Sequence, residues 1–158
     1  MTKVDFYVVE ENSFAEMMHF VCRLTDKIYR LGHKIHIHTS DDSTTQNINK
    51  LLWDYDESAF LPHQIVGPPI DSTAPRTPVE SPITIAESLD PHHCEDVLIN
   101  LGNQVPLWFS RFKRVAEFVG GDEAQREAAR QRYRFYRDRG YNLDMHQIKS
   151  RLTADADS

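Results

Sequence analysis

The chain has 158 residues, which matches the commonest size of a single domain. Its 40% hydrophobic and 27% charged residues are ordinary globular composition, and no apolar run approaches the roughly 20 residues that cross a bilayer. The net charge of −6 argues against a protein whose whole surface grips DNA, because such binding depends on many neutralised phosphates.

The first residues predict a cytoplasmic protein. Met1 leads directly into Val4-Asp5-Phe6-Tyr7, without the basic, apolar and small-residue zones of a signal peptide. Cys22 and Cys94 show no paired spacing, so reduced thiols are expected.

The opening of the chain predicts a strand, a helix and a second strand. Lys3 to Val9 is rich in aromatic and β-branched residues, which favours a strand. Apolar residues then recur at helical spacing from Phe14 to Leu31, with Ser13 as a candidate cap and Gly32 as the stop. Lys34 to Thr39 has the pattern of the second strand, and such a unit most often forms a right-handed parallel crossover.

The rest of the chain continues this alternation. A second helix is predicted from Asp41 to Trp53, capped by Asp41, Asp42 or Ser43, and a short apolar run follows at Gln64 to Val66. Residues 67–82 contain five prolines and predict an exposed loop. The later predictions are strands at Ile83–Ala86, Asp96–Leu101 and Arg114–Val119, a helix at Pro106–Lys113, and a long helix from Asp122 to about Arg139 that ends at Gly140.

Strands that alternate with helices indicate an α/β domain with a mostly parallel central sheet flanked by helices on both faces. No repeat or linker is visible, so a single domain over residues 1–152 is expected. Residues 153–158 are small, polar and acidic, which predicts a frayed tail.

The sequence gives only weak signals for a nucleotide-binding site or a metal site. The turn after the first strand, Glu10-Glu11-Asn12-Ser13, has no glycine and two carboxylates, so it does not suit a phosphate, and neither nucleotide-binding fingerprint occurs. His36 and His38 would share a strand face, and His92-His93-Cys94 could offer zinc ligands, but no third and fourth ligand has the required spacing. Edge-strand histidines and a polar loop are the favoured interpretation, with no metal, cofactor or catalytic residue.

The last helix is the most informative segment. Charge is uneven along the chain: Arg111 to Arg151 holds 11 Lys and Arg against 6 Asp and Glu, which indicates an anionic partner for this end. A row of guanidiniums around one ring suits a peptide with carboxylates and one apolar side chain, although a solvated basic face is equally compatible with the pattern. At 100° per residue, one face gathers Arg126, Arg130, Tyr133 and Arg137, with Arg134 beside them, while Ala128, Ala129, Phe135 and Tyr136 form the packing side.

A second group of large side chains precedes the proline-rich loop. Leu51-Leu52-Trp53 is followed by Phe60-Leu61-Pro62-His63. On pattern alone the aromatics favour a core position, but if they are exposed together they form a protein-binding patch.

At these residues the sequence resembles the chi subunit of bacterial DNA polymerase III, from Phe6-Tyr7 to about Asn142-Leu143. The resemblance implies a Rossmann-like three-layer fold, no catalytic activity and two partners on separate surfaces. The motifs that carry it are Leu52-Trp53 with Phe60 and Pro62-His63, and Arg130-x-Arg132-Tyr133-x-x-Tyr136-Arg137-x-x-Gly140-Tyr141-Asn142-Leu143.

The first implied partner is the psi subunit, which connects chi to the clamp-loader complex. Trp53, Phe60, Pro62 and His63 match the part of the family that meets psi, which reverses the core interpretation of the aromatics. Whether a helicase occupies the same surface at other times stays open.

The second implied partner is the acidic C-terminal tail of single-stranded DNA-binding protein, which ends in phenylalanine. The matching positions are Arg126, Arg130, Tyr133 and Arg134, with Arg137 on the same stripe; lysine also occurs in the family at the first and fourth of these. Asp144-Met145-His146 departs from the polar pattern expected near that tail, and an aspartate there would weaken binding, so these positions are not included.

Two other classes remain open at this stage. A direct single-strand binder would use the same basic helix against phosphates, although it would normally add several stacking aromatics. A metal-dependent enzyme is the third class.

Overall fold

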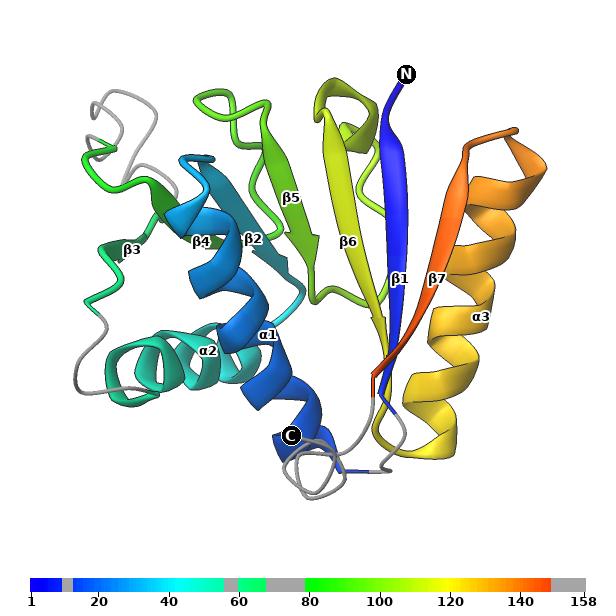
Figure 1. Cartoon of the computed structure of the whole chain (residues 1–158), viewed down its shortest axis with the longest axis horizontal. Helices are drawn as coiled ribbons and strands as arrows, with labels where there is room; N and C mark the ends of the chain where they lie inside the picture. The colour runs from blue at the N-terminus through cyan, green and yellow to red at the C-terminus, as the bar shows by residue number, and fades with distance from the viewer. Residues whose placement is uncertain (10–12, 56–59, 68–78, 149–158) are drawn as a thin grey trace.

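A parallel β-sheet forms the centre of the molecule in the computed structural model, which describes residues 1–9, 13–55, 60–67 and 79–148 (Figure 1). Over these residues it has seven strands in the order β3-β4-β2-β5-β6-β1-β7. Every pair of neighbouring strands is parallel. The strands are β1 (Lys3–Val9), β2 (Ile35–Thr39), β3 (His63–Ile65), β4 (Ile83–Glu87), β5 (Val97–Asn100), β6 (Arg114–Val119) and β7 (Leu143–Ile148).

Three α-helices flank the sheet: α1 (Phe14–Arg30), α2 (Asp42–Asp54) and α3 (Glu123–Asp138). Each begins at a capping side chain: Ser13, Asp41 or Asp122 accepts a backbone N–H of the first turn. Ser13 and Asp41 were predicted as caps, and Asp122 was predicted as the start of its helix. Helices α1 and α2 contribute to the core on one face, and α3 contributes to the core on the other. The predicted three-layer Rossmann-like α/β fold is therefore confirmed.

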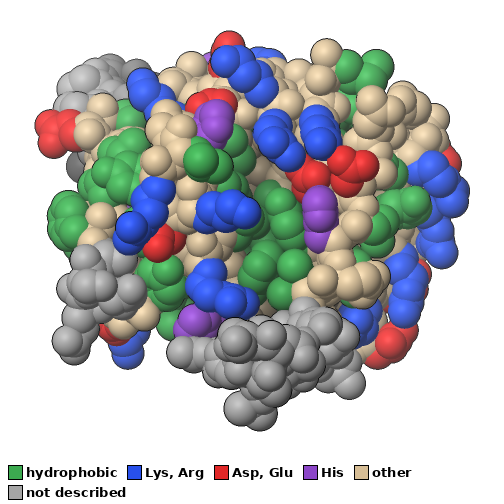
Figure 2. Space-filling model, in the orientation of Figure 1, with side chains coloured by type: hydrophobic (Ala, Val, Ile, Leu, Met, Phe, Trp, Pro, Cys, Tyr) green, Lys and Arg blue, Asp and Glu red, His purple; other side chains and the backbone are tan. Residues whose placement is uncertain are grey.

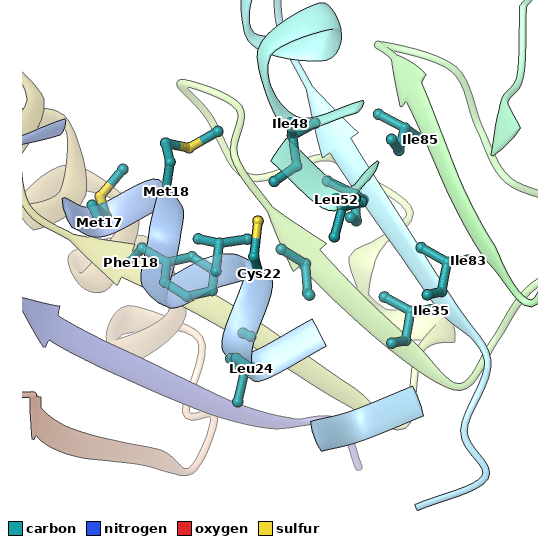
Figure 3. Packing of buried hydrophobic residues seen from close by; sticks show 14 of the residues in the cluster. Met17, Met18, Cys22, Leu24, Ile35, Ile48, Leu52, Ile83, Ile85 and Phe118 are labelled. Carbon is teal, nitrogen blue, oxygen red and sulfur yellow. The ribbon is translucent and has the colours of Figure 1, made fainter. Parts of the chain in front are cut away.

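Strand alternation divides the buried side chains between two cores. On the α1 side, Ile35 of β2, Met18 of α1 and Leu52 of α2 belong to one buried cluster, part of which Figure 3 shows. On the α3 side, Phe6 of β1 lies edge-on to Tyr136, with ring centroids 5.9 Å apart. Both faces of the sheet are buried, which is the usual reason why parallel strands are so apolar.

Three predictions of local structure need correction. The helix predicted over Pro106–Lys113 is a single 3-10 turn, η1 (Phe109–Arg111). Strand β7 was not predicted, because its Leu-Asp-Met-His-Gln-Ile sequence is half polar with no regular alternation, and only pairing with β1 reveals it. His36 and His38 are not edge-strand residues, because β2 lies between β4 and β5 and both side chains are buried.

Other predictions fall largely outside the described residues. Most of the predicted loop over 67–82 and the whole predicted tail over 153–158 are in this category. Within the described part of the chain, no helix combines the length and apolar character needed to span a membrane.

Candidate protein-binding surfaces

Helix α3 is fixed at its first turn by a reciprocal capping box. The Asp122 carboxylate accepts the backbone N–H of Gln125 at 2.8 Å, and the Gln125 side chain accepts that of Asp122 at 2.8 Å. Gly140 ends the helix with a positive φ of 79°, the left-handed conformation that favours glycine at this position.

A buried polar network anchors the inner side of α3 to the sheet. Glu117 of β6 is fully buried and accepts hydrogen bonds from Arg132 Nε at 2.8 Å and from the Tyr136 hydroxyl at 2.7 Å. The Asn100 side chain donates a third, at 2.8 Å. Burial, with Glu117 nearby, raises the pKa of Tyr136 well above its ordinary value, so its hydroxyl stays a donor. The network was missed from sequence, although Arg132 lies three residues after Ala129 and four before Tyr136, on the packing side.

An apolar hollow of about 280 Å3 opens between α3 and the sheet. We call it the α3 hollow. Phe6 and Tyr133 meet edge-on in its wall, with ring centroids 5.4 Å apart. Figure 2 shows Lys and Arg side chains gathered over α3, at the right edge of the view. The hollow is lined by Phe6, Val8, Val119, Ala129, Arg130, Tyr133, Arg134, Arg137 and Met145.

Three of the predicted arginines, Arg130, Arg134 and Arg137, therefore line one apolar space together with the predicted Tyr133. Arg126 does not line it. One of its Nη atoms donates instead to the backbone carbonyl of Val9, at 3.0 Å, and the side chain is half-buried. This places the guanidinium of Arg126 at the end of β1.

The arginines that line the α3 hollow already have acidic neighbours on α3. Arg130 lies 2.9 Å from both Glu123 and Glu127, and Arg134 lies 3.9 Å from Glu127. The Arg130 and Arg134 side chains are each 48% exposed, so these are solvent-accessible ion pairs. Solvent screens such pairs strongly, so a competing carboxylate can replace them at little cost.

Strand β7 sets which residues after Asn142 reach the α3 hollow. Its register with β1 places Met145 opposite Phe6, and Met145 lines the hollow. Asp144 lies on the other face of the sheet, where its carboxylate is 3.1 Å from Lys3 Nζ. The expected unfavourable effect of Asp144 on an acidic peptide is therefore not supported by its position.

The predicted aromatic group forms an exposed patch at the C-terminal end of α2. Trp53 is 50% exposed and Phe60 is 72% exposed, with ring centroids 5.9 Å apart. Leu52 and Leu61, next to them in the chain, are the residues that enter the core. The core interpretation of these two aromatics, based on pattern alone, is thus wrong, and pattern could not decide it because buried and exposed apolar residues alternate here.

His63 packs against the Trp53 ring of this patch. It is buried, its ring centroid lies 4.2 Å from that of Trp53, and its ring nitrogens lie 2.6 Å from the Leu61 carbonyl and 3.1 Å from the Asn49 carbonyl. Pro62 is half-buried. We call Trp53, Phe60, Pro62 and His63 the aromatic patch.

Two of the histidines considered as metal ligands, His36 and His93, contact the same threonine. His36 Nδ1 and His93 Nε2 lie 2.8 Å and 3.0 Å from the hydroxyl of Thr84. Among the residues that the structure describes, no group of three or more His, Cys, Asp or Glu could hold a metal ion.

The parallel sheet with helices on both faces defines a Rossmann-like α/β protein. The same class of fold occurs in the crystal structure of T4 UvsW, which superposes with a TM-score of 0.65 over 94% of this chain and 42% of that one. The sequence identity is 7%, so this likeness concerns the fold alone.

A family model described as DNA polymerase III chi subunit, HolC, matches residues 1–144, and the chain belongs to this family. It is 33% identical to DNA polymerase III subunit chi of Pseudomonas aeruginosa over 148 residues, 94% of this chain and 98% of the relative. The corresponding protein of Haemophilus influenzae is 30% identical over 143 residues, which cover 90% of this chain and 95% of that protein. That of Escherichia coli is 25% identical over 149 residues, 91% of this chain and 97% of the relative.

Proposed function

We propose that this chain is a non-catalytic replisome adaptor. In this proposal it joins the clamp-loader complex, through psi, to the acidic C-terminal tail of single-stranded DNA-binding protein in the cytoplasm. Membership of the DNA polymerase III chi family supports the replication role. The observation that carries the tail-binding function is the α3 hollow, because one apolar space lies directly beside three exposed arginines.

The chemistry of the α3 hollow fits a peptide that ends in phenylalanine. The aromatic ring would enter between Phe6, Tyr133 and Met145, and Arg130, Arg134 and Arg137 would receive the carboxylates. Guanidinium groups bind carboxylates through two parallel hydrogen bonds, each worth about 1.5–3 kcal/mol when charged. A short flexible peptide loses much of this energy to ordering, so micromolar affinity is expected.

The acidic neighbours on α3 support an exchange of ion pairs. Glu123 and Glu127 hold Arg130 in the free protein, and the peptide carboxylates would take their place. Because both the old and the new pairs are exposed, salt is expected to weaken binding as the screening length falls to about 8 Å at physiological ionic strength. Arg126, held at the end of β1, would contribute long-range attraction more than direct contact.

The aromatic patch is the surface we assign to psi. Trp53 and Phe60 present large apolar area to solvent, and aromatic residues with these properties dominate protein–protein hot spots. His63 and Pro62 would act mainly by holding the two rings in place, since they are more buried. The two partners could then bind at the same time.

A peptide titration tests the tail-binding function. Arg130→Ala is expected to weaken binding of a labelled acidic tail peptide about tenfold or more, measured by fluorescence anisotropy. Arg30→Ala is the matched control, because Arg30 makes a comparable 2.7 Å pair with Asp26 within α1. Unchanged affinity in Arg130→Ala would remove the arginines from the mechanism, and an equal loss in both variants would indicate a general charge effect. A bare oligonucleotide in place of the peptide tests direct single-strand binding.

A further inference from the structure

A second cavity, of about 400 Å3, lies at the carboxyl ends of β2, β4 and β5. Its volume is within the range of roughly 300–1,000 Å3 that small-molecule sites occupy. The chain leaves β2 toward α2 on one face of the sheet and leaves the adjacent β5 toward η1 on the other. Diverging connections of this kind create the crevice where open α/β sheets bind ligands. The polar and aromatic residues that line the cavity are His38, Ser40, Ser88, Asn103, Gln104 and Trp108.

The walls of this cavity are held in a specific conformation. Ser88 has a φ of 46°, and it is the one non-glycine residue with positive φ in the described part of the chain. A Cβ at Gly102 would lie 2.8 Å from both His38 Cδ2 and Ser40 Oγ, so the backbone approaches these side chains as closely as glycine allows. The Ser40 hydroxyl also accepts the backbone N–H of Asn103 at 2.9 Å. Unfavourable backbone conformations of this type concentrate at functional sites.

The histidine in this cavity has unused hydrogen-bonding capacity. His38 is 7% exposed, and its Nδ1 is buried with no hydrogen-bond partner among the described residues. Burial lowers the pKa of His38 to about 4, so the ring is neutral at pH 7. Trp108 stands edge-on to this ring, with centroids 5.3 Å apart. The other ring nitrogen, Nε2, is not a buried atom without a partner, and it is the one that can meet a bound group.

We propose that this cavity binds one unstacked, uncharged nucleobase. Carboxamides, hydroxyls and a neutral imidazole supply donors and acceptors for a base edge, and Trp108 supplies an aromatic surface. No lining residue carries a formal charge, and the exposed Asp41 and Glu87 directly adjoin Ser40 and Ser88 in the chain. Carboxylates one residue away from two lining residues disfavour a phosphate compared with an uncharged base. The same chemistry fits a free nucleoside or a base of single-stranded DNA, and the inference goes beyond the proposed adaptor role.

The chain has two tryptophans, so Trp53→Phe leaves Trp108 as its single fluorescent indole. In that background, saturable quenching by thymidine or deoxyadenosine is expected, with the 5′-monophosphates binding more weakly than the nucleosides. Asn103→Ala and Gln104→Ala should each raise the Kd about three- to tenfold, because each removes hydrogen bonds. Gln147→Ala removes an exposed carboxamide from β7 and is the matched control.

The competing outcomes are distinct. No saturable quenching by any nucleoside, tighter binding of the monophosphates, or an equal effect of Gln147→Ala would each overturn the proposal. An oligothymidylate that binds more tightly than thymidine would identify single-stranded DNA as the source of the base, and weaker binding would identify the free nucleoside. Circular dichroism melting of each variant checks that the fold is retained.

Discussion

The α3 hollow and the aromatic patch lie on opposite faces of the sheet. They differ in charge: arginines surround the hollow, whereas the patch presents uncharged rings. The α3 hollow combines an apolar space with arginines that are already paired, such as Arg130 with Glu127. The aromatic patch is apolar and solvent-exposed at Trp53 and Phe60. Exposed ion pairs exchange easily, whereas large exposed rings gain most from permanent burial. Under the proposed function, we expect a reversible contact on α3 and a lasting contact at the aromatic patch.

The largest expected effect is on stability, from breaking the buried pair of Glu117 and Arg132 that holds α3 to the sheet. Glu117→Gln would leave the Arg132 guanidinium buried without its carboxylate, which is expected to cost about 3–5 kcal/mol of unfolding free energy. Urea denaturation measures this, and Glu127→Gln on the exposed side of α3 should leave the denaturation midpoint nearly unchanged. Tail binding should be lost before psi binding as α3 loosens. Equal stability of the two variants would show that the network does not anchor the helix.

The aromatic patch should respond to loss of one ring. Phe60→Ala is expected to weaken psi binding by at least about 2 kcal/mol, or roughly thirtyfold, because a hot-spot aromatic is removed. Co-purification with psi and isothermal titration calorimetry measure the effect. Leu107→Ala, which trims an 88% exposed leucine elsewhere, is the control. Retention of tail binding in Phe60→Ala would separate the two surfaces, and loss of both would indicate misfolding.

The register of β7 makes a sharper prediction for the α3 hollow. Met145→Asp would put a carboxylate into the apolar space and should weaken tail-peptide binding about tenfold, by desolvation and like-charge repulsion. Asp144→Ala, one residue earlier on the other face, should change the affinity less than about twofold. Fluorescence anisotropy measures both. If Asp144→Ala tightened binding strongly, the aspartate would face the peptide after all.

The smallest expected effect concerns the other face of β7. Burial alone would raise the pKa of Asp5, but hydrogen bonds from His146 and Arg114 lower it below its ordinary value of 3.8. A lowered pKa means that ionised Asp5 stabilises the fold above that ordinary value, and the contribution is lost as pH falls through the folded-state pKa. Asp5→Asn should therefore reduce unfolding free energy at pH 7, and the difference from wild type should shrink below about pH 4. A constant difference down to pH 3 would contradict this.

Much of the α3 surface could be predicted from sequence, because residues three or four positions apart lie on the same side of a helix. Arg130, Tyr133 and Arg137 recur at three- and four-residue steps, and the structure places them together. Helical spacing could not show that the Arg126 side chain contacts Val9, because this contact joins segments 117 residues apart. The psi and tail assignments to these residues remain predictions.

Local sequence determined the caps at Ser13, Asp41 and Asp122 and the alternation of strands and helices, because these depend on near neighbours in the chain. Tertiary structure alone decided the rest. It paired β7 with β1, buried Arg132 on Glu117, and gathered three strand ends around the His38 cavity. These features need contacts between distant segments, and the burial of a charged side chain such as Glu117 is stable only where such contacts supply its partners.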